Sequence, residues 1–399
     1  MAEPQNDPTP SPDLLYDFDV PPDLGESPDV GELIDKVCLE LRAHSAALEL
    51  PGDFPEEVAD LLSRSGLTAL CLPRRYGGRG GRLRDLVTAV ERVATVDAAS
   101  AWCLFIMGTA PWLLCHATPE LVAEVYARPD TRIGGALAPT GTVRRGDDGY
   151  VVEGRWAFGS GVNSCQWVAV HAVFADEPVP RSAFVVVPTS EIAYREPWDG
   201  LGLASSGSGL FAVDALTVPA HRVVSSLSGP PAWPDLVFRM SFRATFAACA
   251  AVPLGIATEM LTTFTDHARS KRPTFGNGLL ADQPHAQALV AESWGTVHAA
   301  RALLYQSVDR LEEACADGTP SVRHQAELRI AMNTVRAGCL RVVDRLHLAA
   351  GGGAAKRESR FARLLCDAHT ASQHAMFGAE LTALSGAVLL GRDVPEGLL

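Results

Sequence analysis

Hydrophobic residues in the first third of the chain recur at spacings of three and four positions. The pattern runs through residues 33–41 and resumes at 58–62. Such spacing lines up apolar side chains along one face of a helix. It predicts an all-helical N-terminal domain over residues 29–130. Within this domain we expect a helix at 83–96 and a strongly apolar helix from about 98 to 115.

The pattern changes after residue 130. From 133 to 224 the chain is rich in Gly, Val and Thr, and short alternating runs of apolar and polar residues end at Gly or Pro. Alternation with a period of two is typical of strands with one buried face. Turn residues at 146–149 and 178–180 favour antiparallel connections, and no strand pattern alternates with a helical one. We therefore predict a small antiparallel β-domain over residues 131–238.

Helical spacing returns at residue 241 and continues to residue 391 in four long blocks. Turn-forming residues separate the blocks at 271–284, 317–320 and 351–353. Four helices joined by such breaks are typical of a bundle. The pattern predicts a C-terminal four-helix bundle over 239–399. The whole chain is thus expected to be an α+β protein that is mostly helical.

The last predicted helix follows three consecutive glycines, Gly351 to Gly353, and carries His369 and His374. Glycines at such a turn let the backbone approach a ligand without a side chain in the way. On a helix of 3.6 residues per turn, two histidines five positions apart point in different directions. They are therefore not expected to share a proton or a metal ion. We assign chemistry to His374 and a structural role to His369.

Composition and charge narrow the class of protein. The chain has 399 residues, of which 47% are hydrophobic and 20% charged, and its formal net charge is -13. Residues 1–35 hold ten Asp or Glu and no Lys or Arg, so they contribute -10 and the remainder of the chain only -3. We expect residues 1–28, which are acidic and rich in proline, to form a disordered leader. Clustered basic residues are missing, so no nucleic-acid partner is expected.

Compartment and redox state can also be predicted. The chain does not open with a signal-peptide pattern, and its longest uncharged apolar runs fall short of the ~18 residues that a spanning helix needs. We expect a cytoplasmic protein without a membrane segment. Nine cysteines without a C-x-x-C pair suit reduced, buried thiols, and no metal site is expected.

The string GRWAFGSGV at residues 154–162 suggests a surface for a flat ring. Trp156 and Phe158 are predicted to share one face of a strand. The strand ends at Ser160 and Gly161, where a hydroxyl group and an exposed amide could bind the edge of a heterocycle. The alternative is that both aromatic rings belong to the core and that Ser160 is a turn residue.

Three further sequence strings follow the first along the chain, and their order matters for the comparison with known families. They are GLASSGSGLFAVDALTVP at 202–219, ARSKRPTFGNGLLADQP at 268–284 and the stretch from 346 to 378. Together the four strings resemble the acyl-CoA dehydrogenase superfamily. GRWAFGSGV resembles the G-x-W-x-F-x-S-G signature of its flavin-dependent monooxygenases, which are the oxygenase components of two-component systems.

This resemblance implies a cofactor, reduced FMN or FAD, that a separate flavin reductase delivers, and molecular oxygen as co-substrate. Ser160 would lie beside the flavin N5 edge, and Arg272 would pair with flavin phosphate, held in a neighbouring subunit. Arg272 could equally be a solvated loop residue, and the glycine and serine positions could be plain turns. Ser206 accompanies Ser208 in the second string. The implied cofactor-binding residues are Trp156, Phe158, Ser160, Gly161, Ser208, Arg272, Gly351, Gly352 and Gly353.

The resemblance also bears on the reaction. Acyl-CoA dehydrogenases use a carboxylate base, but residues 368–378 contain no Asp or Glu, and His374 stands in this neighbourhood instead. A histidine suits the activation or alignment of a phenol or amine. The implied reaction is hydroxylation of a small aromatic or amine substrate through a C4a-hydroperoxyflavin, in secondary metabolism. The expected catalytic residues are His374, Ser160 and His116, although His116 could instead be a helix cap.

Several points remain open from the sequence. Trp102 and Trp112 could wall a substrate cavity, but core packing suits both better. The chain has Cys366 where the family usually carries Arg before Asp367. The fold could therefore serve a flavin-independent reaction or acyl desaturation, or a non-catalytic binding role. The resemblance implies a homotetramer or homodimer.

Overall fold

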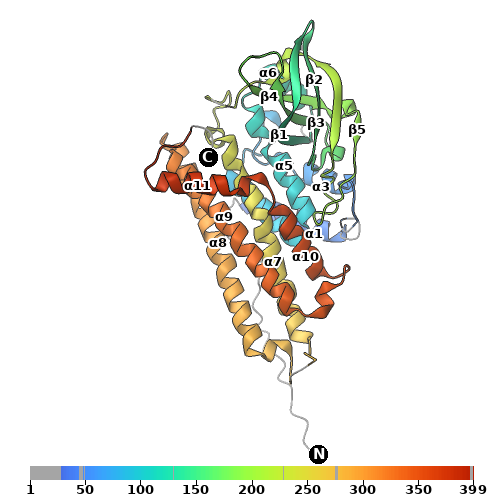
Figure 1. Ribbon diagram of the computed structural model, residues 1–399, viewed down its shortest axis with the longest axis vertical. Coiled ribbons are helices and arrows are strands. Elements are labelled where there is room, and N and C mark those ends of the chain that lie inside the picture. The colour runs from blue at the N-terminus through green and yellow to red at the C-terminus, as the bar shows by residue number, and fades with distance from the viewer. Residues whose placement is uncertain are drawn as a thin grey trace, which may run out of the picture.

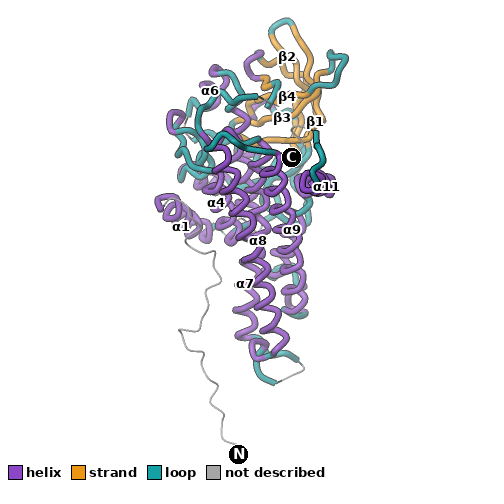
Figure 2. Tube along the Cα trace, turned by 90° about the vertical axis from the view of Figure 1, so that its left-hand side faces the viewer, coloured by secondary structure: helices purple, strands orange, loops and turns teal. Residues whose placement is uncertain are grey.

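A helical lobe and a helical bundle flank a single sheet in the computed structural model (Figures 1 and 2). The chain begins in the lobe, forms the sheet and then returns through the bundle, in the order that the sequence predicts. The predicted leader falls almost wholly outside the described part of the chain. The described residues are 28–44, 48, 50–128, 130–227, 229–274, 277–395 and 399.

The N-terminal lobe is built around one apolar helix. This helix, α5, is capped by Asp97, whose carboxylate accepts a 2.7 Å hydrogen bond from the Ser100 amide. Almost all of its side chains are buried, so it forms the core that the neighbouring helices cover. The two helices predicted at 83–96 and 98–115 are confirmed. The helices of the lobe are α1 (Pro28–Ala43), α3 (Glu56–Arg64), α4 (Leu83–Val96), α5 (Ala98–Leu114) and α6 (Pro119–Val125).

The sheet has seven strands in the order β5-β6-β2-β1-β3-β4-β7. Apolar side chains on the strands form a core of their own, apart from the larger helical core. The strands are β1 (Ile133–Gly146), β2 (Gly149–Trp156), β3 (Trp167–Phe174), β4 (Ser182–Pro188), β5 (Tyr194–Arg195), β6 (Phe211–Val218) and β7 (Val223–Val224).

One strand pair departs from the antiparallel prediction, because β1 and β3 run parallel. β2 folds back beside β1 as a hairpin, and the chain then crosses to the other side of β1 to begin β3. Two reversals return the chain to its first direction. A parallel pair therefore arises without a connecting α-helix, and the alternating pattern alone does not reveal it.

The C-terminal helices pack around α7, which lies against α4, α8, α9 and α10. The segment Phe242–Ser270, which contains α7, is long and apolar enough to cross a membrane, but 94% of its most apolar window is buried inside the molecule. Its composition is thus explained by its central place in the core. The helices are α7 (Ala247–Ser270), α8 (Pro284–Ala316), α9 (Val322–Ala349), α10 (Arg360–Ala371) and α11 (Ala379–Leu389).

The last predicted helix is wrong in one respect, because it is two helices. α10 ends at Ala371, and α11 begins at Ala379. Between them His374 has an extended backbone, and its ring nitrogen Nδ1 accepts a hydrogen bond from the Met376 amide at 3.3 Å. A side chain that bonds to a backbone amide in this way competes with helix continuation. His369 lies on α10 and pairs with Asp344 of α9 at 2.8 Å.

Asp367 connects α10 to the loop between β5 and β6. The buried carboxylate accepts a 2.6 Å hydrogen bond from the Leu203 amide. Burial raises the pKa of Asp367 from 3.8 to about 7, although Arg360 and Arg363 act to lower it. Directly before Asp367 the chain carries Cys366 in place of the family's arginine. Arg363 and Arg360, one and two helical turns before Asp367, supply positive charge instead.

The raised pKa predicts how stability changes with pH. The folded state holds the Asp367 proton more tightly than the unfolded state, so this group makes folding less favourable as pH rises from about 4 to about 7. Asp367→Asn keeps an acceptor for Leu203 and removes the titration. We expect the variant's stability relative to the unmodified protein to rise by roughly 4 kcal/mol over that range, measured by urea unfolding. A difference that stays constant with pH would contradict this.

Candidate active site

His374 lies in an aromatic box at the junction of the lobe and the bundle. Its ring centroid is 5.5 Å from Trp102 and 6.2 Å from Phe105, both on α5, and 5.5 Å from Phe246 at the start of α7. Arg329 of α9 lies near enough to act on its charge. Burial, followed by the repulsion from Arg329, lowers the pKa of His374 from 6.5 to about 4. His374 is therefore neutral near pH 7.

The hydrogen bonding of His374 also fixes its tautomer. Nδ1 accepts the hydrogen bond from the Met376 amide, so in the neutral ring the proton must be on Nε2. A neutral imidazole in this state donates from Nε2. The geometry therefore favours donation of a hydrogen bond to a ligand oxygen or nitrogen over removal of a proton.

The Ser160 hydroxyl also contacts Trp102. The Trp102 indole N–H donates to Ser160 Oγ at 3.0 Å. Ser160 Oγ lies 2.8 Å from Ser208 Oγ, which lies 2.6 Å from Ser206 Oγ. All three serines are buried. Trp102 thus brings together Ser160 from the β-domain and His374 from the bundle, which are 214 positions apart in the sequence.

The predictions for Trp156 and Gly161 need correction. Trp156 is fully buried within the sheet core, where it stacks on Phe211 and donates to the His171 carbonyl at 2.8 Å. It cannot line a ligand from there. The Gly161 amide is not exposed, because the loop after β5 folds back and its Ser206 carbonyl accepts that N–H at 2.8 Å.

Phe158 does not share a face with Trp156, and it is the aromatic residue that reaches the surface. Its side chain is 67% exposed and meets Trp198 edge to face at 6.3 Å. Its backbone has φ 64°, a conformation that a bulky residue rarely adopts and that often marks a functional site. The exposed Phe158 ring, beside the partly buried Trp198 and near the buried serines, offers apolar surface to a flat ligand.

Arg272 and the three glycines lie at the end of the bundle that is away from the sheet. Arg272 follows the end of α7, and the glycines follow the end of α9. The two ends meet, because His267 of α7 bonds to the Ala350 carbonyl at 3.0 Å. Figure 1 shows this end of the bundle far from the sheet. The length of α10 alone, about 18 Å for its residues, separates the glycines from His374. A single chain therefore does not bring them to Ser160 and His374.

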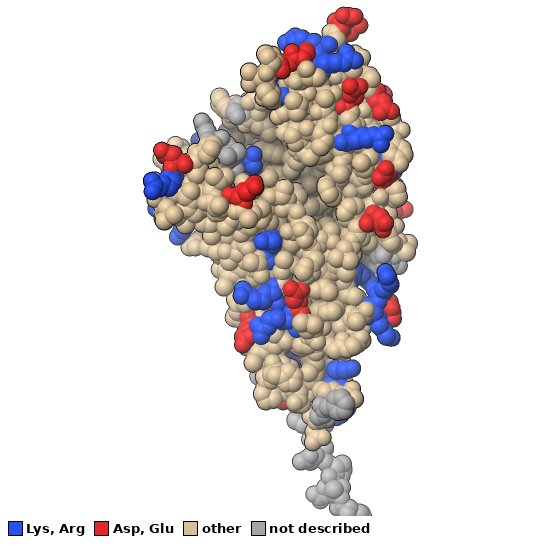
Figure 3. Space-filling model, viewed as in Figure 1, with Lys and Arg blue, Asp and Glu red and all other residues tan. Residues whose placement is uncertain are grey.

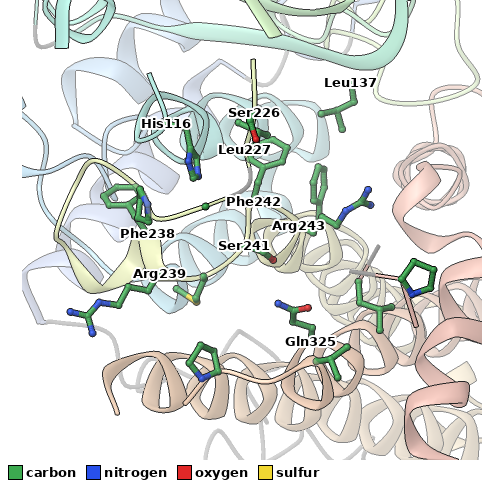
Figure 4. A pocket seen from close by; sticks show the side chains of 18 of the residues that line it. His116, Leu137, Ser226, Leu227, Phe238, Arg239, Ser241, Phe242, Arg243 and Gln325 are labelled. Carbon is green, nitrogen blue, oxygen red and sulfur yellow. The ribbon is translucent and has the colours of Figure 1, made fainter. Parts of the chain in front are cut away.

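A cavity of about 1130 Å³ adjoins the aromatic box. Phe246 and Met376 line the cavity and also contact His374. His116 lies on its wall near Phe238, across from Gln325 of α9 (Figure 4). Burial lowers the pKa of His116. The face in Figure 3 is also hollowed below the sheet, with charges of both signs scattered around uncharged surface.

Several residues of this candidate site do not stand out in the sequence. Trp102 could wall a substrate cavity, although the sequence favours core packing for it, and the structure adds a polar partner, Ser160, for its buried indole N–H. Phe105 and Phe246 follow ordinary core spacing and carry no distinguishing pattern. Arg329 lies on α9, where helical spacing does not reveal that the side chain is buried at 2% exposure.

Two family models match the chain on either side of the sheet. The model of the acyl-CoA dehydrogenase N-terminal domain matches residues 32–128, and that of the C-terminal domain matches residues 247–379. The fold described above agrees with both. The chain belongs to the acyl-CoA dehydrogenase superfamily, as its four sequence strings predict.

Curated relatives share most of the chain. The oxygenase component of the FADH2-dependent resorcinol hydroxylase from Rhizobium sp. is 29% identical over 349 residues, which cover 82% of this chain and 85% of the relative. The indole-3-acetate monooxygenase of Pseudomonas putida is 27% identical over 380 residues, 94% of this chain and 97% of the relative. The predicted likeness to the monooxygenase branch of the superfamily is confirmed.

Solved structures agree with these relatives. The HsaA monooxygenase from Mycobacterium tuberculosis superposes with a TM-score of 0.83 and 25% identity, over 93% of this chain and 99% of that protein. XiaF from Streptomyces sp., solved with FADH2 and glycerol, has the same fold, with a TM-score of 0.84 and 22% identity.

The lowered pKa of His374 can be tested in the flavin-free protein. We expect its imidazole signals, assigned by comparison with His374→Asn, to titrate near pH 4 and to show the Nε2–H tautomer at pH 7, by NMR after histidine labelling. Because the folded pKa lies below 6.5, the folded state also loses up to about 3 kcal/mol of stability as pH falls from 6.5 to 4. A midpoint near 6.5 would refute the assigned environment.

Proposed function

We propose that this chain is the oxygenase component of a two-component flavin-dependent monooxygenase. It takes reduced FMN or FAD from a separate reductase and uses molecular oxygen to hydroxylate a small aromatic or amine substrate. The observation that carries the proposal is the meeting of the Ser160 hydroxyl and the neutral His374 imidazole on Trp102. The names of the curated relatives support the same reaction class.

The residues around this junction suit a flavin. Phe158 presents exposed aromatic surface beside the partly buried Trp198, and the buried hydroxyls of Ser160 and Ser208 lie in the adjoining loops. A flat heterocycle could lie on this aromatic surface, and its polar edge could form hydrogen bonds with these hydroxyl groups. Reduced flavin, when bound, supplies the electrons with which dioxygen reacts. The protein supplies binding, orientation and exclusion of water.

Ser160 and His374 have distinct roles in this proposal. Trp102 donates to Ser160 Oγ, so the Ser160 hydrogen is left for Ser208 or for a nitrogen of the bound ring. His374 donates from Nε2 to the substrate and orients it. The aromatic box of Trp102, Phe105 and Phe246 keeps water from both groups. His116, on the wall of the adjoining cavity, contacts the substrate.

Acyl desaturation receives no support from this geometry. It needs a carboxylate base beside the substrate, and the charged group that acts on the pKa of His374 among the described residues is an arginine, Arg329. The buried carboxylate nearest in sequence, Asp367, is engaged with the Leu203 amide. Oxygen insertion does not require such a base.

A second copy of the chain completes the cofactor site in this proposal. Among the described residues, a β-carbon added to Gly351, Gly352 or Gly353 would meet nothing within 4 Å apart from its neighbours in the chain, so internal packing does not explain why Gly352 and Gly353 are glycines. Close approach of a group from outside the chain does explain it. We assign these glycines and the exposed Arg272 to the flavin of a neighbouring subunit in a homodimer or homotetramer.

The role of His374 predicts a graded series of variants. His374→Ala and His374→Asn should bind flavin normally and lose hydroxylation by about 2 to 4 decades. Asn can still accept from the Met376 amide, so its loss would come from the missing Nε2–H donor. His374→Gln places an amide N–H further out and should keep part of the activity. Product formation, coupled to a flavin reductase, measures the effect, and unchanged turnover in His374→Ala would refute the role.

Arg272 has a separate test. Arg272→Ala should weaken the binding of flavin by about tenfold or more and leave turnover at saturating flavin nearly unchanged, because a guanidinium–phosphate pair acts on binding alone. Arg269→Ala is the matched control, since Arg269 lies three residues earlier and pairs with Asp266 at 3.2 Å. Equal flavin affinity in both variants would show that the phosphate assignment is wrong.

A further inference from the structure

The cavity beside His374 has an unusual balance of charge. Among the described residues that line it, four have arginine side chains and one, Asp393, has a carboxylate side chain; Leu399, the last residue of the given sequence, also lines it. Arg181 already pairs with Glu177, and Arg239 donates to the Cys315 carbonyl at 3.4 Å. The arginines that line the cavity are Arg181, Arg239, Arg243 and Arg392.

Arg243 is the arginine closest in the chain to the aromatic box, because it lies between Phe242 and Phe246 in the turn that leads into α7. It is half-buried, and burial lowers its pKa. Within the described chain no carboxylate forms an ion pair with it. Figure 4 shows its side chain beside Phe242 on the cavity wall. Partial burial of a cation without a counter-ion is costly, so the position favours an anion from outside the chain.

Arg329 adds a second cation behind the first. It is 2% exposed, its Nη1 donates to the Met376 carbonyl at 3.3 Å, and its Nε has no partner among the described residues. Burial, together with repulsion from Arg243, lowers the pKa of Arg329 to about 10. Two arginines that repel each other, with neither paired to a carboxylate in the described chain, form a site that an anion would stabilise.

Other groups suit the body of such a ligand. Ser241 lines the cavity, and its buried hydroxyl has no partner among the described residues. Gln325 reaches in from α9, one turn before Arg329. Apolar rings complete the wall, and these are Phe184, Phe238, Phe242 and Phe246.

We propose that this cavity binds a substrate with an aromatic body and a carboxylate, and that Arg243 pairs with the carboxylate while Arg329 strengthens its field. The inference rests on the proposed oxygenase function and names the class of substrate that it acts on. Phe246 and Met376 line the cavity and also contact His374, so a ligand anchored at Arg243 lies against residues that touch the His374 ring. A guanidinium fork matches the two oxygens of a carboxylate.

The test compares one acid with its neutral counterpart, without flavin. The probes are 3-(4-hydroxyphenyl)propanoate, the corresponding amide, and 4-ethylphenyl phosphate, with binding to the full-length protein measured by calorimetry at pH 7.5. We expect the acid to bind about 10- to 100-fold more tightly than the amide, the usual worth of a hydrogen-bonded ion pair. Equal affinities, failure of both to bind, or a preference for the phosphate over the acid would overturn the proposal.

Variants show whether Arg243 causes the preference. Arg243→Met keeps the volume, removes the charge and should abolish the acid's advantage, whereas Arg243→Lys should keep part of it. Arg345→Met is the control, because it removes one charge from a surface pair with Glu292. Urea unfolding checks that each variant is folded. An advantage that survives in folded Arg243→Met would overturn the assignment.

The binding test is independent of catalysis. If the protein proved unable to hydroxylate any substrate, the acid would still bind in preference to the amide, and only the proposed function would fail. If hydroxylation occurred but neutral phenols were the better ligands, the carboxylate site would fail and the oxygenase function would stand.

Discussion

The hydrogen bond from Trp102 to Ser160 is the constraint on which the site depends. It joins α5, the most buried helix of the lobe, to the loop that follows β2. The same loop approaches α5 so closely that a β-carbon at Gly161 would lie 2.9 Å from Met107. Since His374 packs on the Trp102 ring, this contact sets the separation of a serine and a histidine that come from different domains.

The electrostatic environment of His374 results from its burial among aromatic rings, with an arginine as the charged group that acts on it. The described groups around His374 are aromatic rings and an arginine, so the imidazole is kept neutral and its free nitrogen carries a proton. In the nearby cavity, Arg243 lines the wall, and its charge acts on the buried Arg329. Such surroundings favour neutral oxygen atoms and anions as ligands and do not provide a strong base. They suit the alignment of a substrate before oxygen insertion.

Much of the fold could be predicted because hydrophobic spacing is a local property. The helices at 83–96 and 98–114 and the breaks between α7, α8 and α9 follow directly from it. The break at His374 depends on a hydrogen bond that spacing does not encode. The parallel pair of β1 and β3 depends on which side of β1 the chain returns to, which is a tertiary choice.

Only part of the candidate site follows from the sequence. Residue type and resemblance indicate His374 and Ser160, and in the structure both contact Trp102. The direction of the Trp156 ring and the partner of the Gly161 amide were not predictable, because a distant segment, residues 202–209, supplies the acceptor and covers the strand end. The burial of a charged residue such as Arg329 depends on how the helices pack together, so the sequence pattern does not predict it.

The most direct test of the account is the fate of reduced flavin on the protein in air. Reduced FMN or FAD, mixed with the protein in air-saturated buffer and followed by stopped-flow absorbance, should reoxidise more slowly than free flavin, since a closed aromatic site excludes water. Trp102→Phe, which keeps the ring and removes the N–H that holds Ser160, should lose much of this protection. Reoxidation at the free-flavin rate with the unmodified protein would contradict the account.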